Sequence, residues 1–351
     1  MKKNKNIFKK IKKIKLDNLI IGIIVILIIG GVGIYMAFSN KETPERKEVK
    51  ETIPEKKLNI VNLNSKSRPY AVSINNIGAA RGVQSGLQDA YIIYEMIVEG
   101  GLTRYLALFI DADVERIGSV RSARHYFLDY VLENDAIFVH HGQSPQAQSD
   151  FSRLNVDRIV VDNSKTGWRD KSLNLSSEHT LFTSTDKLAS GIGSKRTERN
   201  KDYLLKYSVD PLDLSKIPES KEASSVSIKY SSSVTSSYDY DSTNKVYKRS
   251  VNQKAHVDYV SKEQYTFKNI IVYEVANNKI SGDSSGRQNL NTVGSGTGYY
   301  ISEGVALPIT WSKSSRASAT VYKYDSGDDL IVNDGNTFIQ IMPKGQNLII
   351  T

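Results

Sequence analysis

The sequence contains no cysteine in its 351 residues. Without thiols the chain can form no disulfide bond, thiolate metal site, cysteine nucleophile or acylated lipobox. Histidine is also rare: there are five, and no two have the H-x-x-x-H spacing of a helical metal site. The glycine-rich stretch VGSGTGYY at residues 293–300 lacks the GK[ST] of a P-loop, which favours a tight turn over a nucleotide site. We therefore expect no bound metal and no cofactor.

The net charge of +9 is not spread evenly over the chain. Residues 1–18 hold eight lysines against one acid, Asp17, and so carry +7. The remaining 333 residues hold 39 Lys and Arg against 37 Asp and Glu, which leaves only +2. A nearly neutral body lacks the basic surface that binding to a phosphate backbone requires, so we expect no nucleic-acid partner.

Residues Leu19–Phe38 form a run of 20 uncharged, strongly apolar residues, which is the length of a helix that crosses a bilayer. The lysines before this run predict a cytoplasmic tail at residues 1–18, so the chain after it is extracytoplasmic. A cleaved secretory signal is the alternative, and it predicts the same topology. Residues 39–57 are charged, contain two prolines and indicate a solvated linker. We thus predict a single-pass protein anchored in the cytoplasmic membrane.

The rest of the chain divides by composition near residue 220, where serine becomes frequent. Residues 58–220 combine strand-like runs with helical stretches, and they predict an N-terminal layered α/β domain with a mixed sheet. Residues 221–351 hold many short β-prone runs separated by turn formers, which predict a smaller antiparallel β-rich domain. The expected fold class is α+β, with one N-terminal transmembrane helix.

Two β-prone runs, Ala90–Glu99 and Leu102–Ile110, are separated by a Gly-Gly pair and predict a hairpin. With a two-residue loop, Glu95, Glu99 and Arg104 fall on one side of the ribbon. One interpretation is a cross-strand cluster of ion pairs. The functional interpretation makes Glu95 or Glu99 a general base, although the two carboxylates lie too far apart to act as a glycosidase pair.

A helix is predicted over residues 119–133, with Ser119 as its N-cap. Arg121 and Arg124 then project from one face of its first two turns. Because a helix N-terminus carries partial positive charge, two cations there are unfavourable unless an anion lies nearby. The pattern predicts a phosphate or carboxylate site, which Arg104 would assist. The alternative is internal pairing of both arginines with acids such as Glu95, Glu99, Asp111 or Asp113.

The run Ala136–His141, with the sequence AIFVHH, predicts a buried strand. Neighbouring strand residues point to opposite faces, so only one of His140 and His141 can reach the arginines and donate a hydrogen bond to the anion. The same alternation argues against a metal site made by the two histidines.

Several segments resemble the YerB-like family of bacterial cell-envelope proteins. They are RPYAVSINN (Arg68–Asn76), EMIVEGGLTRYLALF (Glu95–Phe109), ERIGSVRSARHYF (Glu115–Phe127), FVHHGQSP (Phe138–Pro145) and VGSGTGYY (Val293–Tyr300). The resemblance covers residues 58–351 and implies a membrane-tethered, extracytoplasmic protein with two consecutive domains of unknown function. It supplies no activity. YerB-like proteins are often lipoproteins, whereas this chain has no lipobox cysteine, so Leu19–Phe38 must take over the anchoring.

These observations favour one function and leave two alternatives open. The favoured function is binding of an anionic cell-envelope component, such as a cell-wall polymer, or of an envelope partner protein. The residues expected at that site are Arg121, Arg124, Arg104, Ser119 and one of His140 and His141. The first alternative is a hydrolase or transferase that acts on a phosphorylated envelope glycan, with Glu95 or Glu99 as the base. The second is a pure scaffold, in which internal acids neutralise Arg121 and Arg124.

Overall fold

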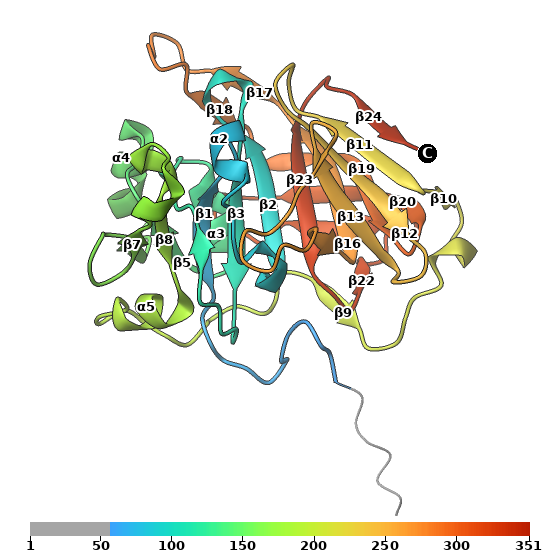
Figure 1. Cartoon of the computed structure of the whole chain (residues 1–351). Coiled ribbons are helices and arrows are strands. Elements are labelled where there is room, and N and C mark those ends of the chain that lie inside the picture. Colours follow the sequence, from blue (N-terminus) through green and yellow to red (C-terminus); the bar gives the residue numbers. More distant parts are fainter. Residues whose placement is uncertain (1–56) are drawn as a thin grey trace, which may run out of the picture. The chain divides into compact units, whose positions relative to one another are not determined.

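Strands dominate residues 57–351, which are the part of the chain that the computed structural model describes (Figure 1). Residues Lys56–Thr351 pack as one compact unit. The predicted span Leu19–Phe38, the tail before it and nearly all of the linker lie outside the described residues. Within residues 57–351, no helix is long and apolar enough to cross a membrane.

The main feature is an 11-stranded sheet that contains strands from both halves of the sequence. Its strand order is β10-β20-β19-β16-β23-β2-β3-β1-β5-β6, and β21 pairs with β20. The strands are β1 (Tyr70–Asn75), β2 (Ile92–Ile97), β3 (Thr103–Phe109), β5 (Ile137–His140), β6 (Arg158–Val160), β10 (Lys221–Glu222), β16 (Asn269–Val275), β19 (Gly294–Ser302), β20 (Val305–Lys313), β21 (Val321–Tyr324) and β23 (Thr337–Pro343).

Smaller sheets and short helices surround this large sheet. One six-stranded sheet comprises β11 (Ser225–Lys229), β12 (Thr235–Asp241), β13 (Val246–Val251), β14 (Lys254–Ala255), β15 (Thr266–Phe267) and β24 (Leu348–Ile350). The remaining strands are β4 (Ile117–Gly118), β7 (Trp168–Arg169), β8 (Leu181–Thr183), β9 (Lys206–Ser208), β17 (Asn277–Lys279), β18 (Gln288–Leu290) and β22 (Ile331–Asn333). The helices are α2 (Gly78–Arg81), α3 (Phe127–Glu133), α4 (Pro145–Arg153) and α5 (Thr185–Ser190), with 3-10 turns that include η2 (Glu99–Gly101) and η4 (Ser177–His179).

The predicted α+β fold class is wrong, because the described chain is predominantly β. The helices are few and short, and a central strand of the sheet, β23, pairs in parallel with β2 of the first half and β16 of the second. The parallel pair of β16 and β23 also corrects the prediction of an antiparallel β-rich C-terminal domain. Burial explains the arrangement: β2, β3 and β23 are buried along their whole length, and strands with two covered faces favour a sheet interior. One continuous hydrophobic core runs from Val61 to Met342.

The predicted hairpin forms, but its register differs from the prediction by one residue. Ile97 pairs with Thr103, Met96 with Arg104, and Glu95 therefore lies opposite Tyr105. The reason is a longer loop: the Val98 N–H donates to the Leu102 carbonyl, and both loop glycines have positive φ. Because a one-residue shift moves every side chain to the other face, Glu95 and Arg104 point to opposite sides of the sheet.

The helix predicted over residues 119–133 begins only at Phe127. Before it, the backbone is extended and bonded to its neighbours: the Val120 N–H donates to the Leu181 carbonyl and the Arg121 N–H to the Ser73 carbonyl. Ser119 is therefore not an N-cap. The apolar side chains of this segment are buried because strands lie against it on both sides. A sequence pattern does not reveal such contacts, so the spacing was mistaken for that of a helix.

Candidate functional site

Six strands of the large sheet run in the same direction. β1 is parallel to β5 and β5 to β6, β2 and β16 are both parallel to β23, and β1 and β2 are each antiparallel to β3. Their carboxyl ends therefore meet at one edge, which we call the carboxyl edge. In open α/β sheets, ligands bind in crevices outside the carboxyl ends of the parallel strands, and the mixed sheet of this chain has a comparable edge. The residues that end these strands are Asn75, Ile97, His140, Val160, Val275 and Pro343.

Arg104 lies at this edge because it is near the start of the antiparallel strand β3, opposite Asn75 of β1 and Met96 of β2. The extended segment 119–124 crosses the same edge. The Asn75 N–H donates to the Ser119 carbonyl, and the Ala123 N–H donates to the carbonyl of Gly142, just after β5. These backbone bonds place the predicted arginines beside Arg104, although no helix carries them.

Four arginines gather here, and we call Arg104, Arg121, Arg124 and Arg169 the arginine cluster. Arg124 is paired most completely: its Nε and Nη2 each donate to Glu99 at 2.6 Å. Burial raises the pKa of Glu99, but the bonds and charge of Arg124 outweigh it and bring that pKa below its ordinary value. This pair is a closed internal ion pair.

Arg121 is paired less completely. Its Nη2 donates to Glu178 at 3.0 Å, while its Nε is buried and has no partner in the described chain. The Glu178 side chain is 49% exposed, so solvent weakens this ion pair. Glu178 also lies 3.4 Å from Nε2 of His179, whose Nδ1 contacts Asn75 at 3.1 Å. An anion can therefore compete with Glu178 for Arg121.

Neither Arg104 nor Arg169 makes a direct ion pair with a carboxylate among residues 57–351, although the charge of Glu99 acts on Arg104 through space. Arg104 is only 5% exposed, and its Nη1 donates to the Ser122 carbonyl at 2.5 Å. Burial, helped by the neighbouring Arg124, lowers the pKa of Arg104 to about 9. Arg169 donates to the Ser177 carbonyl and contacts His141 Nε2 at 3.2 Å. The cluster thus holds four guanidinium groups against two carboxylates, and a buried cation that bonds no carboxylate directly is unfavourable.

The two adjacent histidines lie in different surroundings. His141 belongs to the cluster: its Nδ1 bonds the Val161 carbonyl at 2.7 Å, and its Nε2 faces Arg169. His140 is fully buried, with its ring stacked on Phe151 at 5.1 Å. Burial lowers the pKa of His140 to about 4, and its Nε2 has no partner in the part of the chain described.

The remaining predicted residues lie away from solvent. Ser119 is buried, and its Oγ has no hydrogen-bond partner among residues 57–351. Glu95 is fully buried in the sheet interior and pairs with Arg249 at 2.8 Å. It also accepts hydrogen bonds from Thr103 and Ser236. Neither Glu95 nor the paired Glu99 is a free carboxylate, so the geometry gives no support to a general base at either position.

Three residues near the cluster are not predicted from the sequence: Arg169, Glu178 and His179. They belong to β7 and η4, and a small sheet brings them to the cluster because β8 pairs with both β4 and β7. No spacing in the sequence links them to Arg121. The closed pairs Arg124–Glu99 and Arg121–Glu178 are contacts that the scaffold interpretation expects, but that interpretation leaves Arg104 and Arg169 unexplained.

Gly282–Gly286, with the sequence GDSSG, matches the G-x-S-x-G pattern of serine hydrolases. In the structure this pentad lies in the turn between β17 and β18. A nucleophile elbow requires a turn from a strand into a helix, and the Asp283 carboxylate is occupied by Arg287 at 2.8 Å. The match therefore carries no catalytic assignment.

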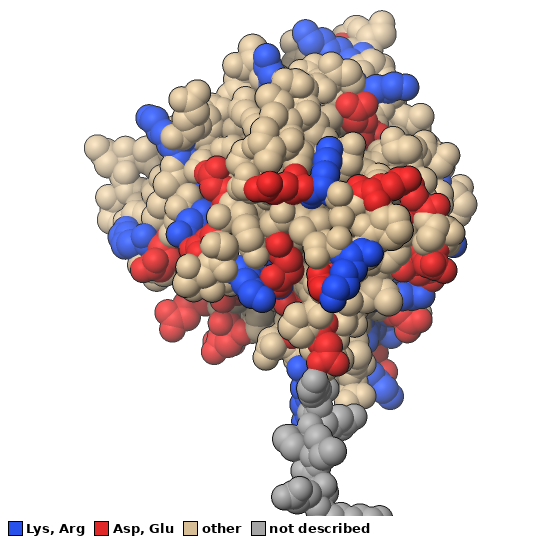
Figure 2. Space-filling model, turned by 90° about the vertical axis from the view of Figure 1, so that its right-hand side faces the viewer, with Lys and Arg blue, Asp and Glu red and all other residues tan. Residues whose placement is uncertain are grey.

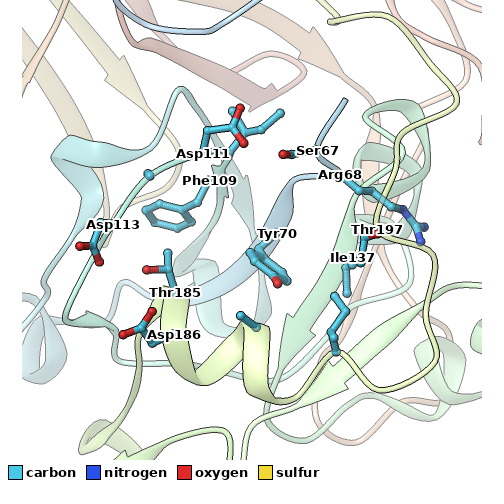
Figure 3. A pocket seen from close by; sticks show the side chains of 14 residues that line it. Ser67, Arg68, Tyr70, Phe109, Asp111, Asp113, Ile137, Thr185, Asp186 and Thr197 are labelled. Carbon is cyan, nitrogen blue, oxygen red and sulfur yellow. The ribbon is translucent and has the colours of Figure 1, made fainter. Parts of the chain in front are cut away.

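The opposite edge of the same strands has a different character (Figure 3). A cavity of about 350 Å³ is lined there by Tyr70 at the start of β1 and Phe109 at the end of β3. Asp111, Asp113 and Asp186 also line it, and all three are exposed.

On the face shown in Figure 2, basic and acidic side chains are interspersed, so no extended patch of one sign forms there.

Comparisons with known proteins agree on one family. The model described as "Protein of unknown function (DUF3048) N-terminal domain" matches residues 58–198, and the model of the C-terminal domain matches residues 226–339. The chain is 31% identical over 284 residues to "Putative lipoprotein YerB" of Bacillus subtilis (strain 168), which covers 79% of this chain and 81% of the relative.

The crystal structure of the YerB protein from Bacillus subtilis resembles this fold with a TM-score of 0.70 at 27% sequence identity. The match covers 84% of this chain and 99% of the other. Both family domains, a relative of this identity and the shared fold lead to the same conclusion: the chain belongs to the YerB-like family, whose two domains are of unknown function.

Proposed function

We propose that the protein is a membrane-anchored, extracytoplasmic cell-envelope protein that binds an anionic group of the envelope at the arginine cluster. The observation that carries this proposal is the unbalanced charge: four guanidinium groups face two carboxylates, and the buried Arg104 has only a backbone carbonyl as partner. Phosphates and carboxylates accept hydrogen bonds from guanidinium groups in a matching geometry, so such an anion would supply the missing counter-charge.

The division of roles follows from the contacts. Arg124 is held by Glu99 and orients the site, while Arg104, Arg121 and Arg169 bind the anion. Glu178 occupies Arg121 in the free protein and is displaced toward solvent, where its carboxylate is already half exposed. His141 accepts a hydrogen bond from Arg169 and so holds that side chain at the rim.

Anchoring supports the same location. The Bacillus subtilis relative is named a lipoprotein, but this chain has no cysteine to carry a lipid. The apolar run Leu19–Phe38 takes the place of the lipid, and the lysines before it keep the N-terminus in the cytoplasm. Protease treatment of intact protoplasts tests this topology: residues 57–351 should be digested, and protection of that region would contradict it.

Calorimetric titration of the full-length chain in detergent tests the binding. The probes are a glycerol-phosphate polymer as a teichoic-acid model, a lipid pyrophosphate analogue and a muropeptide. The Arg121→Gln/Arg169→Gln variant should bind the preferred probe at least tenfold more weakly. Lys206→Gln is the control, because Lys206 pairs with the exposed Asp329 and belongs to β9, outside the large sheet. Equal affinity in the wild type and the double variant would refute the site.

A further inference from the structure

A second cavity opens beside the arginine cluster, between the two halves of the sequence. It has a volume of about 490 Å³. One wall is the start of α3 with His125 and Tyr126, and the other is the β17–β18 hairpin with the residues that follow it. The two walls touch, since His125 Nε2 lies 2.9 Å from Asn289 Oδ1. Pockets between two packed regions of a chain are common ligand sites.

The cavity and the cluster lie at the same edge of the sheet. β17 follows β16, which ends at the carboxyl edge. His125 directly follows Arg124 in the chain, and the hydroxyl of Tyr126 donates to the carbonyl of Ile97, the last residue of β2, at 2.7 Å. Glu99, the partner of Arg124, is two residues farther along. The cavity therefore lies at the same edge of the sheet as the guanidinium groups, next to the backbone of Arg124.

The chemistry of the cavity differs from that of the cluster. Asn278, Asn289 and Asn291 line it with exposed amide side chains. Within the described residues the side-chain amide of Asn291 has no hydrogen-bond partner, and the side chain of Asn289 uses only its Oδ1. The charges are balanced: Arg316 bonds Asp129, and Thr292 also donates to Asp129. Ala276 and Val293 also line the cavity and supply accessible apolar surface.

We infer that this cavity is a carbohydrate subsite, so that the ligand of the protein is an anionic glycan rather than a free anion. Each sugar hydroxyl both donates and accepts a hydrogen bond, and an amide side chain offers both a donor and an acceptor. The apolar floor matches the C–H face of a sugar ring, and the neutral interior excludes a second charged group. The sugar lies in the cavity and its phosphate or carboxylate reaches Arg104 and Arg121. The charged part of this inference rests on the anion site proposed above.

The test separates the two sites by using three probes on the full-length chain in detergent. They are inorganic phosphate, the neutral oligosaccharide chitotetraose, and N-acetylglucosamine 1-phosphate. The sugar phosphate should bind at least tenfold more tightly than inorganic phosphate. In the Asn289→Ala/Asn291→Ala variant its affinity should fall to that of inorganic phosphate, while the affinity for inorganic phosphate itself stays within twofold. Asn64→Ala is the control, since Asn64 is exposed and remote in sequence from both sites.

The outcomes distinguish the two proposals. Equal affinities for the sugar phosphate and inorganic phosphate overturn the carbohydrate subsite and leave the anion site standing. If inorganic phosphate does not bind, the anion site fails. In that case chitotetraose tests the carbohydrate subsite independently of the anion site. Binding that the asparagine variant abolishes supports the subsite, and absence of binding overturns it. Circular dichroism of each variant confirms that the fold is retained.

Discussion

Two buried arginines of this protein, Arg249 and Arg104, show what separates a structural charge from a functional one. Arg249 is fully buried in the sheet interior, where it donates to Glu95 at 2.8 Å, to Ser236 at 2.8 Å and to Tyr238 at 3.2 Å. Arg104 is 5% exposed at the carboxyl edge and donates only to a backbone carbonyl. The interior therefore bonds Arg249 directly to its counter-charge, whereas Arg104 bonds no carboxylate and shares the charge of Glu99 with Arg124.

The pKa shifts of the two arginines point in opposite directions. Burial lowers the pKa of both, but for Arg249 the nearby Tyr105, Tyr238 and Glu95 outweigh burial and raise it. For Arg104, burial and the adjacent Arg124 lower it to about 9. The fold thus stabilises the charged form of Arg249 and destabilises the charged form of Arg104. A local imbalance of this kind is typical of sites that await a ligand.

Breaking the interior pair should have the largest effect. Arg249→Met leaves Glu95 buried without its cation and should lower the free energy of unfolding by about 3–5 kcal/mol. Chemical denaturation measures this loss. The Glu95→Gln/Arg249→Met variant removes both charges and should recover part of the stability. A loss below about 1 kcal/mol for the single variant would show that the pair is not a structural element.

His140 extends the comparison to a buried basic group that can lose its proton. Its folded pKa of about 4 lies below the ordinary 6.5, so the unfolded chain binds a proton at higher pH than the folded chain. The stability from neutral His140 is present above pH 6.5 and is lost as pH falls toward 4. Between pH 7 and 4.5 this amounts to about 2 kcal/mol.

The measurement is the difference in unfolding free energy between pH 7 and pH 4.5, for the wild type and for His140→Gln. Other titrating groups contribute to both proteins and cancel in the comparison. The wild type should lose about 2 kcal/mol more than the variant. Equal losses would mean that the pKa of His140 in the folded protein is the same as in the unfolded chain.

Replacing Arg104 should separate stability from binding. Arg104→Met removes a strained charge and keeps much of the side-chain volume, so the free energy of unfolding should stay equal or rise by up to about 1 kcal/mol. The affinity for inorganic phosphate should fall at least tenfold, which corresponds to about 1.4 kcal/mol. Denaturation and calorimetry on the same preparation check both. A destabilised variant with intact binding would make Arg104 another structural arginine.

Glu178 should act as an internal competitor for Arg121. Glu178→Gln frees that guanidinium group and should raise the affinity for inorganic phosphate about threefold, since an ion pair with a half-exposed carboxylate is weak. Glu198→Gln is the matched control, because Glu198 is exposed and pairs with no basic side chain in residues 57–351. A weaker affinity in Glu178→Gln would instead make Glu178 a residue that positions Arg121.

The smallest effect is expected at the opposite edge of the sheet. Asp111, Asp113 and Asp186 are exposed, so water already solvates their charges. Replacing all three by Asn should change the free energy of unfolding by less than about 0.5 kcal/mol and leave phosphate affinity within about twofold. A large loss of stability would show that the acidic edge also holds its charges under strain.

The sequence predicted local features of the site better than their surroundings. The strand at Ala136–His141 and the hairpin around the Gly-Gly pair are confirmed, as β5 and as β2–β3. The hairpin register was wrong because loop hydrogen bonding, rather than the glycine pair alone, determines the pairing. The helix start at Ser119 was wrong because backbone bonds to Ser73 and Leu181 override the apolar spacing.

By itself, the sequence determined the absence of thiol chemistry, the near-neutral body and the concentration of arginines around residues 104–124, because these depend only on which residues are present and how they are spaced. The tertiary structure decided which arginines are neutralised. Arg124 finds Glu99, Arg121 finds Glu178 and Arg249 finds Glu95, across separations of 25 to 154 residues. Arg104 bonds no carboxylate. This outcome could not be predicted, because burial and pairing depend on contacts between distant segments, which no local pattern encodes.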